Sequence, residues 1–275
     1  MKRATHWIVA STVIALAVAG LARSAELNAD QIINRYVEAR GGARAWQKIQ
    51  TMAWEGHIKA AAGTATNAPF VLELKRPYMT RFEMIVTGQK SARVFNGERG
   101  WKLRSTHGGR PEVRDYTPEE VDFARDALGM DGPLVDYQAK GVAIALAGMD
   151  QIEGHKAYHL NITLPSGAVH RVWIDAHSFL ELKYERDTHN RAGQAGIVAV
   201  YYRNYQTFKG LTIPFTIETG DPERPSDKMI IERIALNPEL DDALFEGGGA
   251  SHHRSAQTQT PTESSVPEGS GNAKN

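Results

Sequence analysis

The sequence predicts a mainly β fold built from antiparallel strands, with a few helices. Apolar and polar residues alternate with a period of two over several short segments, which is typical of strands that bury one face. Turn residues such as Asn-Gly and Pro-Ser-Gly separate these segments, as they do in β-hairpins. Helical patterns with capping residues occur near the start and near the middle of the chain. These observations favour a strand meander with inserted helices.

Composition limits the classes of function. The chain has 275 residues, of which 41% are hydrophobic, so it can bury one sizeable core without division into several domains. Its 32 basic and 32 acidic residues balance, and no excess of positive charge is present to attract nucleic acid or an anionic membrane. Nucleic acid is therefore not an expected partner.

The N-terminus has the layout of a secretory signal peptide. Lys2 and Arg3 precede an apolar run over residues 7–21, and small residues follow up to Ala25. The run is shorter than the ~20 apolar residues that span a bilayer. We therefore expect residues 1–25 to be a signal peptide, cleaved after Ser24 or Ala25. The chain has no cysteine, which excludes disulfides and acylation on its own cysteine, so we expect a soluble exported protein.

A helix is predicted directly after this segment. Asn28 is a plausible N-cap, Gly41 and Gly42 end the helix, and residues 43–49 form a second short turn. The apolar stripe of these two segments comprises Ile32, Ile33, Tyr36, Val37, Trp46 and Ile49. Strands are then predicted over residues 52–59, 70–76, 79–86, 91–95 and 100–104.

A second helix interrupts the strands. Thr117 and Glu120 form a capping box with Pro118 at the first helical position, and Gly129 ends the helix. A helix inserted between strands is a natural candidate for a lid or plug. Its expected inner face is Val121, Phe123 and Leu128.

Strands resume over residues 141–147 and continue into a three-stranded meander over residues 153–185. If residues 165–167 form a three-residue hairpin loop with Gly167 in the left-handed region, Leu160 pairs with Val172 and Tyr158 with Ile174. A two-residue loop would instead place Trp173 opposite Leu160. We favour the first register.

The same reasoning extends an apolar stripe over the third strand of the meander. A five-residue connection would pair Leu180 with Ile174 and Leu182 with Val172. The stripe is then either a core or a binding surface.

The remaining chain is predicted as a polar loop over residues 187–196, a hairpin of residues 197–208 and 211–218, a last strand over 228–236 and a short turn over 240–245. From residue 247 the composition changes to Gly, Ser, Thr, Gln and Pro. Such a segment buries too little apolar surface to offset the entropy of ordering. Residues 247–275 are therefore expected to be a flexible tail.

The sequence lacks a glycine-rich phosphate loop, a Gly-x-Ser-x-Gly elbow and a His-Glu-x-x-His zinc pair. His155 and His159 are four residues apart on a predicted strand, which separates their side chains by about 13 Å, too far for one zinc ion. We therefore expect no catalytic residues, no metal and no cofactor.

Aromatic residues gather in the next predicted hairpin, where Tyr201, Tyr202, Tyr205 and Phe208 lie close in sequence. Aromatic residues are common in strands because they suit a pleated surface. They also line pockets for apolar ligands. Both interpretations stay open at this stage.

Two motifs resemble those of a known family. They are the closing Asn-Pro-x-Leu-x-x-x-Leu-Phe segment from Asn237 to Phe245, and Gly154-x-x-Ala157-Tyr158-x-Leu160 leading into Val172-Trp173-Ile174-Asp175. Together with the order of elements, they make residues 26–246 similar to the periplasmic outer-membrane lipoprotein-sorting protein family, which has the LolA/LolB-like fold. The resemblance implies an unclosed antiparallel β-barrel whose concave apolar face is covered by the N-terminal and inserted helices.

The resemblance also implies a periplasmic carrier that binds the acyl chains of a lipoprotein or another lipid and passes them toward the outer membrane. The expected partners are a lipid or acylated protein and a protein of the inner or outer membrane, and we expect a monomer. The candidate cavity lining is Phe82, Met84, Trp101, Tyr158, Leu160, Ile162, Val172, Ile174, Leu180 and Leu182. The alternatives are a lipid sensor or scaffold that binds a regulatory partner, and a hydrolase with its groups in the loop 187–196.

Overall fold

The computed structural model describes residues 27–61, 67–104, 111–189, 194–221 and 227–246. The predicted signal peptide, residues 1–25, and the predicted tail, residues 247–275, lie outside the described residues. The described residues form a mainly β structure with few helices, which confirms the predicted fold class.

Three α-helices, thirteen strands and one 3-10 turn make up the described chain. The helices are α1 (Ala29–Ala39), α2 (Ala43–Gln47) and α3 (Pro118–Asp126), and the closing turn is η1 (Asp242–Phe245). The strands before α3 are β1 (Thr51–Lys59), β2 (Asn67–Lys75), β3 (Met79–Val86), β4 (Gln89–Phe95), β5 (Gly100–Arg104) and β6 (Glu112–Asp115). The strands after it are β7 (Ala143–Ile152), β8 (His155–Thr163), β9 (Val169–Asp175), β10 (Glu181–His189), β11 (Ala195–Phe208), β12 (Leu211–Gly220) and β13 (Asp227–Leu236).

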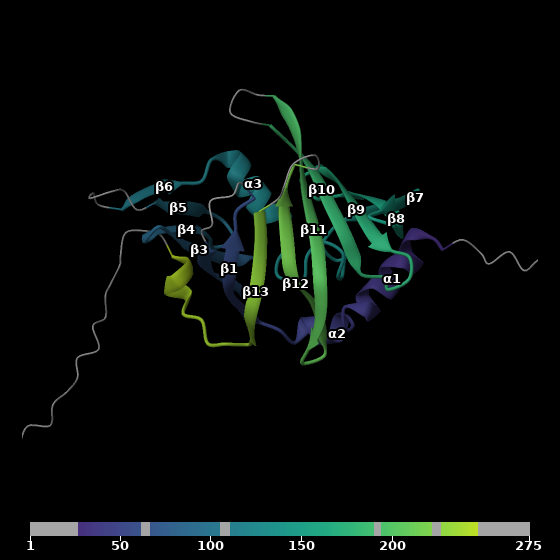
Figure 1. Cartoon of the computed structure of the whole chain (residues 1–275), viewed down its shortest axis with the longest axis horizontal. Helices are drawn as coiled ribbons and strands as arrows, with labels where there is room; N and C mark the ends of the chain where they lie inside the picture. The colour runs from purple at the N-terminus through teal and green to yellow at the C-terminus, as the bar shows by residue number, and fades with distance from the viewer. Residues whose placement is uncertain (1–26, 62–66, 105–110, 190–193, 222–226, 247–275) are drawn as a thin grey trace, which may run out of the picture.

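All strands belong to one antiparallel sheet, in the order β6-β5-β4-β3-β2-β1-β13-β12-β11-β10-β9-β8-β7. The first and last strands pair at its centre, where β1 lies against β13. Its two edges, β6 and β7, come from the middle of the chain and do not pair with each other, so the sheet is not closed (Figure 1).

This topology determines the place of the inserted helix. The segment with α3 connects β6 to β7, and these are the two edges of the sheet. The connection must therefore pass from one edge to the other, across the gap of the unclosed barrel. In Figure 1, α3 lies at the upper end of the sheet, whereas α1 and α2 lie at the lower end.

The predicted register of the first hairpin in the meander is confirmed. Leu160 pairs with Val172 and Tyr158 with Ile174, and Gly167 has a φ of 88° in the connecting turn. Glycine is favoured there because residues with a Cβ rarely adopt this left-handed backbone.

The predicted register of the next strand is wrong. The connection is one residue longer than predicted, so that Glu181 rather than Leu180 lies opposite Ile174; a β-bulge between Glu181 and Lys183 then shifts the pairing again, so that Tyr184 lies opposite Val172. The bulge inserts one extra residue and exchanges the faces beyond it. As a result, a carboxylate and a phenol occupy the positions on the concave face where Leu180 and Leu182 were expected.

The main core lies between α1 and the strands that follow α3. It contains Ile32, Ile33 and Tyr36 of α1 and the fully buried strand residues Leu160, Ile162, Val172 and Ile174. A second cluster forms where Phe245 of the closing turn packs against Val94 and Trp101. The closing turn thus stabilises the half of the sheet that α1 does not cover.

A candidate lipid cavity with a polar cluster

The sheet and helices enclose a cavity of about 470 Å³. Its wall includes residues of β1 and β2 and of β9 to β12. These strands lie on both sides of the central β13, so the sheet curls around the cavity. Helices α1 and α3 and the loop 127–133 complete the wall. Its apolar lining includes Trp54, Leu72, Met130, Pro133, Val198, Val200 and Ile217.

The size of the cavity suits one acyl chain. A volume of about 470 Å³ is many times the ~30 Å³ that one water molecule takes up in the liquid. This volume lies within the range of small-molecule sites. A lipid with two or three long chains would need the cavity to expand.

A polar cluster, consisting of Tyr36, Arg40, Glu181 and Tyr205, forms part of the same wall. The guanidinium of Arg40 donates from Nη1 to the Tyr36 hydroxyl at 2.6 Å. The Tyr205 hydroxyl donates to the backbone carbonyl of Glu181 at 2.9 Å. Arg40 and Glu181 are each only 9% exposed.

The end of α1 holds Arg40 in this position. Its Nε donates to the carbonyl of Thr212 at 2.8 Å, and its own carbonyl accepts from Thr212 N at 3.1 Å and from Trp46 Nε1 at 3.0 Å. The next residue is Gly41, with a φ of 106°, where an added Cβ would lie 2.1 Å from the Gly210 carbonyl oxygen. A glycine is thus required for α1 to approach the β11–β12 turn so closely.

Burial sets the protonation of the cluster. Burial raises the pKa of the Glu181 carboxyl to about 7, although attraction by Arg40 and hydrogen bonding with Tyr36 act in the opposite direction. Burial also raises the pKa values of the phenols of Tyr36, Tyr202 and Tyr205. Near neutral pH the cavity wall therefore presents a permanent cation, neutral hydroxyl groups and a carboxyl that exchanges its proton readily.

Further along the cavity, the Tyr184 hydroxyl is hydrogen-bonded to Nδ1 of His170. Burial lowers the pKa of this histidine, so the neutral imidazole is favoured. The pair itself is uncharged, whereas Asp126 and Arg186 line the same cavity beside it.

Helix α3 covers the cavity with few packed contacts. None of its residues is buried, and Phe123, which lines the cavity, is 48% exposed with the Arg186 guanidinium 4.2 Å from its ring centroid. Its other contacts are polar: Glu120 pairs with Lys102 at 2.7 Å, and Asp126 accepts from Ser166 Oγ at 3.0 Å. Elements with few buried apolar contacts open at low cost. Helix α3 is thus held mainly by polar contacts.

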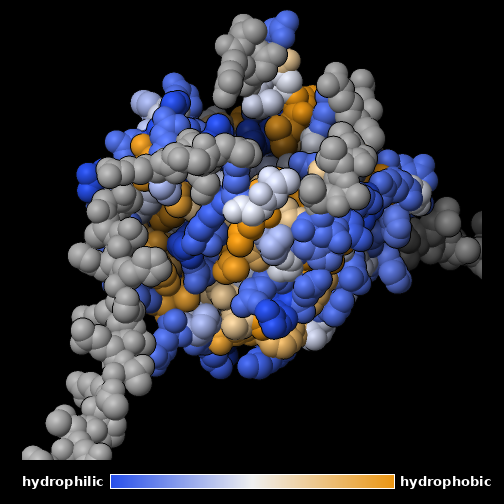
Figure 2. All heavy atoms as spheres, turned by 60° about the vertical axis from the view of Figure 1, so that its left-hand side comes forward, coloured by the Kyte–Doolittle hydropathy of each residue, from blue (hydrophilic) through white to orange (hydrophobic). Residues whose placement is uncertain are grey.

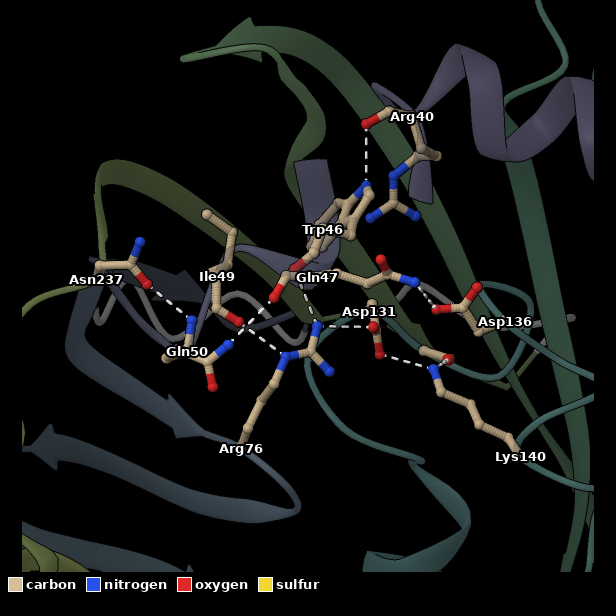
Figure 3. A network of polar contacts seen from close by, with 11 residues as sticks. Arg40, Trp46, Gln47, Ile49, Gln50, Arg76, Asp131, Asp136, Lys140 and Asn237 are labelled. Atoms are coloured by element: carbon tan, nitrogen blue, oxygen red, sulfur yellow. Dashed lines mark hydrogen bonds and ion pairs between the residues drawn. The ribbon is translucent and has the colours of Figure 1, made fainter. Parts of the chain in front are cut away.

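The loop after α3 is attached more firmly. Asp131 is 3% exposed and lies between two cations, with Arg76 Nη2 at 2.8 Å and Lys140 Nζ at 2.7 Å (Figure 3). Arg76 also donates to the carbonyls of Trp46 and Ile49, which connects the loop to the segment around α2. The network fixes one wall of the cavity while α3 stays lightly packed.

The structure places the predicted lining residues in different surroundings. Leu160, Ile162, Val172 and Ile174 lie in the packed core under α1, while Tyr158, Leu180 and Leu182 are partly buried. Phe82 and Met84 line a separate pocket of about 170 Å³ between β3 and β5. Trp101 on β5 pairs with Val94 on β4, whereas Phe82 on β3 pairs with Arg93, so Trp101 and Phe82 do not lie in the same row across the sheet. Trp101 packs under the closing turn instead.

Of the predicted lid residues, Phe123 lines the cavity, Leu128 is buried in the core just after the helix, and Val121 is partly buried on α3. Sequence reasoning missed Arg40 and Glu181. No local signal marked Glu181, because Leu180, Glu181 and Leu182 alternate between apolar and polar residues, which predicts that Glu181 faces outward; the observed register of β10 overrides this alternation. The aromatic cluster of β11 does contribute Tyr202 and Tyr205 to the wall.

The described residues lack two further features. They contain no group of three or more His, Cys, Asp or Glu side chains that could hold a metal ion. Within the same ranges, no helix has the length and apolar character needed to cross a membrane. On the face shown in Figure 2, hydrophilic side chains cover much of the surface and hydrophobic atoms are visible between them.

No protein-family model matches the sequence, and no curated protein matches it either. Solved structures do share its fold. A DUF1329 family protein from Desulfovibrio piger has a TM-score of 0.51 at 14% identity, covering 79% of this chain and 96% of its own. A putative outer membrane lipoprotein-sorting protein domain from Vibrio parahaemolyticus also has a TM-score of 0.51, at 13% identity, covering 78% of this chain and 94% of its own.

A LolA superfamily protein from Nitrosomonas europaea gives the same TM-score of 0.51 at 13% identity, covering 81% of this chain and 99% of its own. At such low identities the likeness concerns the fold. It confirms the predicted LolA/LolB-like fold, an unclosed antiparallel barrel with helices.

Proposed function

We propose that residues 26–246 form a periplasmic lipid carrier that shields an acyl chain in the cavity and passes it toward the outer membrane. The observation that supports this most directly is an apolar cavity of about 470 Å³, bounded by a curled sheet and a lightly packed helix. The shared fold with a putative lipoprotein-sorting domain agrees with this proposal. The balanced charge of the chain is consistent with binding through apolar contacts.

A carrier of this kind meets a clear physical need. A chain of about fifteen methylene groups, at ~0.8 kcal/mol each, represents roughly 12 kcal/mol of unfavourable exposure to water. Such a chain does not cross an aqueous compartment at a useful rate without cover. The carrier must also release the chain, which favours an adaptable apolar cavity under a movable cover. The proposed function requires no chemistry on the cargo.

The proposal is tested by filling the cavity. We expect Val200→Trp to reduce the lipid that co-purifies with the protein from its native periplasm several-fold, because the larger side chain occupies the space of the ligand. The stability should fall by less than the 1 to 3 kcal/mol that overpacking of a tight core costs. Mass spectrometry of the extracted lipid and urea denaturation give the two readouts.

Val113→Trp is the matched control, since Val113 is 41% exposed on the edge strand β6. This variant should keep its lipid. Absence of any lipid from the parent protein, or unchanged lipid in Val200→Trp, would contradict a carrier that uses this cavity. Transfer of bound lipid to acceptor vesicles then separates a carrier from a sensor.

The cover is tested by crosslinking it. Asp126 of α3 and Ser166 of the β8–β9 turn lie 3.0 Å apart at their side-chain oxygens, and the chain has no cysteine of its own. We expect the double variant Asp126→Cys, Ser166→Cys, joined by a short bis-maleimide, to take up lipid at least about tenfold more slowly than the same variant before crosslinking. The reason is that α3 can no longer move away from the sheet. Stopped-flow uptake of a fluorescent fatty acid measures the rate.

The uncrosslinked double variant controls for the loss of the two native side chains. Equal uptake rates before and after crosslinking would show that lipid enters by another route, and α3 would not be the cover.

A further inference from the structure

We propose that the cavity takes a single-chain lipid with a free carboxylate, a long-chain fatty acid, and that the carboxylate binds at the polar cluster of Tyr36, Arg40, Glu181 and Tyr205. This inference rests on the proposed function and specifies its ligand. The acyl chain would lie along Trp54, Val200 and the other apolar lining, with the head directed inward.

The first reason is the charge of the cluster. Arg40 lines the cavity, is 9% exposed and cannot lose its proton in a protein. The hydrogen bonds that the structure gives its guanidinium use Nε and Nη1, toward Thr212 and Tyr36, whereas a guanidinium has five N–H groups. The remaining N–H groups of this planar cation can donate to a carboxylate, which accepts two parallel hydrogen bonds from a guanidinium.

The second reason is the excess of donors in the wall. Trp54 lines the cavity, and its Nε1 is buried without a hydrogen-bond partner among the described residues. The phenol of Tyr202 also lines the cavity and stays protonated, because burial raises its pKa. Unpaired donors in the wall of an apolar cavity favour a ligand that offers hydrogen-bond acceptors. A carboxylate offers acceptors, whereas an ammonium group offers only donors.

The third reason concerns Glu181, whose carboxylate would repel an anionic head. Burial raises the pKa of this carboxyl to about 7, so a proton neutralises it at little cost near neutral pH. The charged and titratable groups facing it are Arg40 and Tyr36 from α1, Tyr202 and Tyr205 from β11 and Tyr184 from β10. Binding of a carboxylate would therefore be accompanied by proton uptake at Glu181.

The fourth reason is volume. The cavity of about 470 Å³ falls within the range typical of sites for small molecules. A single-chain acid of this size fits it, whereas a phospholipid has two chains and a large head. Monoalkyl phosphates remain as a competing anionic class, and the test includes them.

The experiment measures the affinity of the full chain for tetradecanoate, its methyl ester and tetradecyl phosphate by displacement of a fluorescent fatty acid. We expect the acid to bind at least about tenfold more tightly than the ester, since a charge-assisted hydrogen bond contributes this much or more. Arg40→Gln should weaken binding of the acid at least about tenfold more than binding of the ester, and so remove the preference.

Arg40 also supports the fold through Thr212, so a second variant is needed. Tyr202→Phe should weaken binding of the acid several-fold more than binding of the ester. Tyr201→Phe is the matched control, because Tyr201 points to the other face, where Lys183 Nζ lies 5.4 Å from its ring centroid. The control should bind all three ligands as the parent does.

The pH dependence gives an independent readout. The ligand carboxylate is ionised throughout, so its affinity should fall about tenfold between pH 6 and pH 8 as Glu181 loses the proton that binding requires. Glu181→Gln should flatten this dependence and raise the affinity at pH 8. The ester should show no such change.

The outcomes separate the two proposals. If neither acid nor ester binds, the carrier itself is wrong. If the ester binds as tightly as the acid, and the Arg40 and Glu181 variants do not distinguish them, a lipid carrier remains but the carboxylate site is wrong. Tighter binding of the phosphate than of the acid would also overturn the assignment to fatty acids.

Discussion

Replacing Asp131 by alanine is expected to lower the free energy of unfolding by about 3 to 5 kcal/mol, as is usual when one partner of a buried ion pair is removed. The carboxylate is almost fully buried and lies 2.8 Å from Arg76 Nη2 and 2.7 Å from Lys140 Nζ. Its removal leaves two partly buried cations without their counter-charge. Urea denaturation monitored by tryptophan fluorescence measures the loss.

A nearby aspartate provides the control for this variant. Asp136 is only partly buried and accepts a solvent-exposed hydrogen bond from Gln47 Nε2 at 2.8 Å, and its φ of 52° is tolerated by asparagine. Asp136→Asn should therefore change stability by no more than about 0.5 kcal/mol. A loss at Asp131 no larger than this would mean that the network in Figure 3 contributes little to the fold.

The Asp131 variant also bears on function, because the residue belongs to the loop that forms one wall of the cavity. With this loop released, a carrier should exchange its lipid faster even under conditions in which the chain remains folded. Stability and exchange rate would then change together, as expected when one network supports both the fold and the wall.

Local features of the fold could be predicted from the sequence because short-range chemistry determines them. The capping box of Thr117 and Glu120 forms with both of its hydrogen bonds, and the helix follows from it. Gly167 fixed the β8–β9 register through the left-handed position that such a loop requires. These signals act over a few residues, so tertiary contacts did not override them.

The site could not be predicted in the same way, because it depends on long-range packing. The pairing of β1 with β13 decides that Trp54 and Val200 face one cavity, and no local pattern indicates this pairing. The connection before β10 is one residue longer than predicted, which places the Glu181 carboxyl where alternation predicted leucine, and the bulge after Glu181 exchanges the faces of the strand again. The alternation in β8 predicts which of its faces is apolar but does not distinguish a packed face from an open one, and the position of α1 determines which part of the concave face is packed and which part stays open.

The division between packed core and open cavity leads to the second large effect. Leu160 is fully buried against α1, so Leu160→Ala should cost about 2 to 5 kcal/mol, through lost transfer energy and the void left behind. Leu72 lines the cavity and is partly buried, so little packing is lost there. The matched substitution Leu72→Ala should therefore cost well below this range.

The two substitutions should also differ in their effect on lipid. Leu72→Ala enlarges the cavity and should preserve or increase the lipid bound, whereas Leu160→Ala should leave lipid binding unchanged at temperatures where the variant is folded. Paired urea denaturation and lipid mass spectrometry decide the matter. If Leu160→Ala kept its stability and bound more lipid, the acyl chain would lie under α1, along Leu160, Val172 and Ile174. Helix α1 rather than α3 would then have to move to admit the lipid.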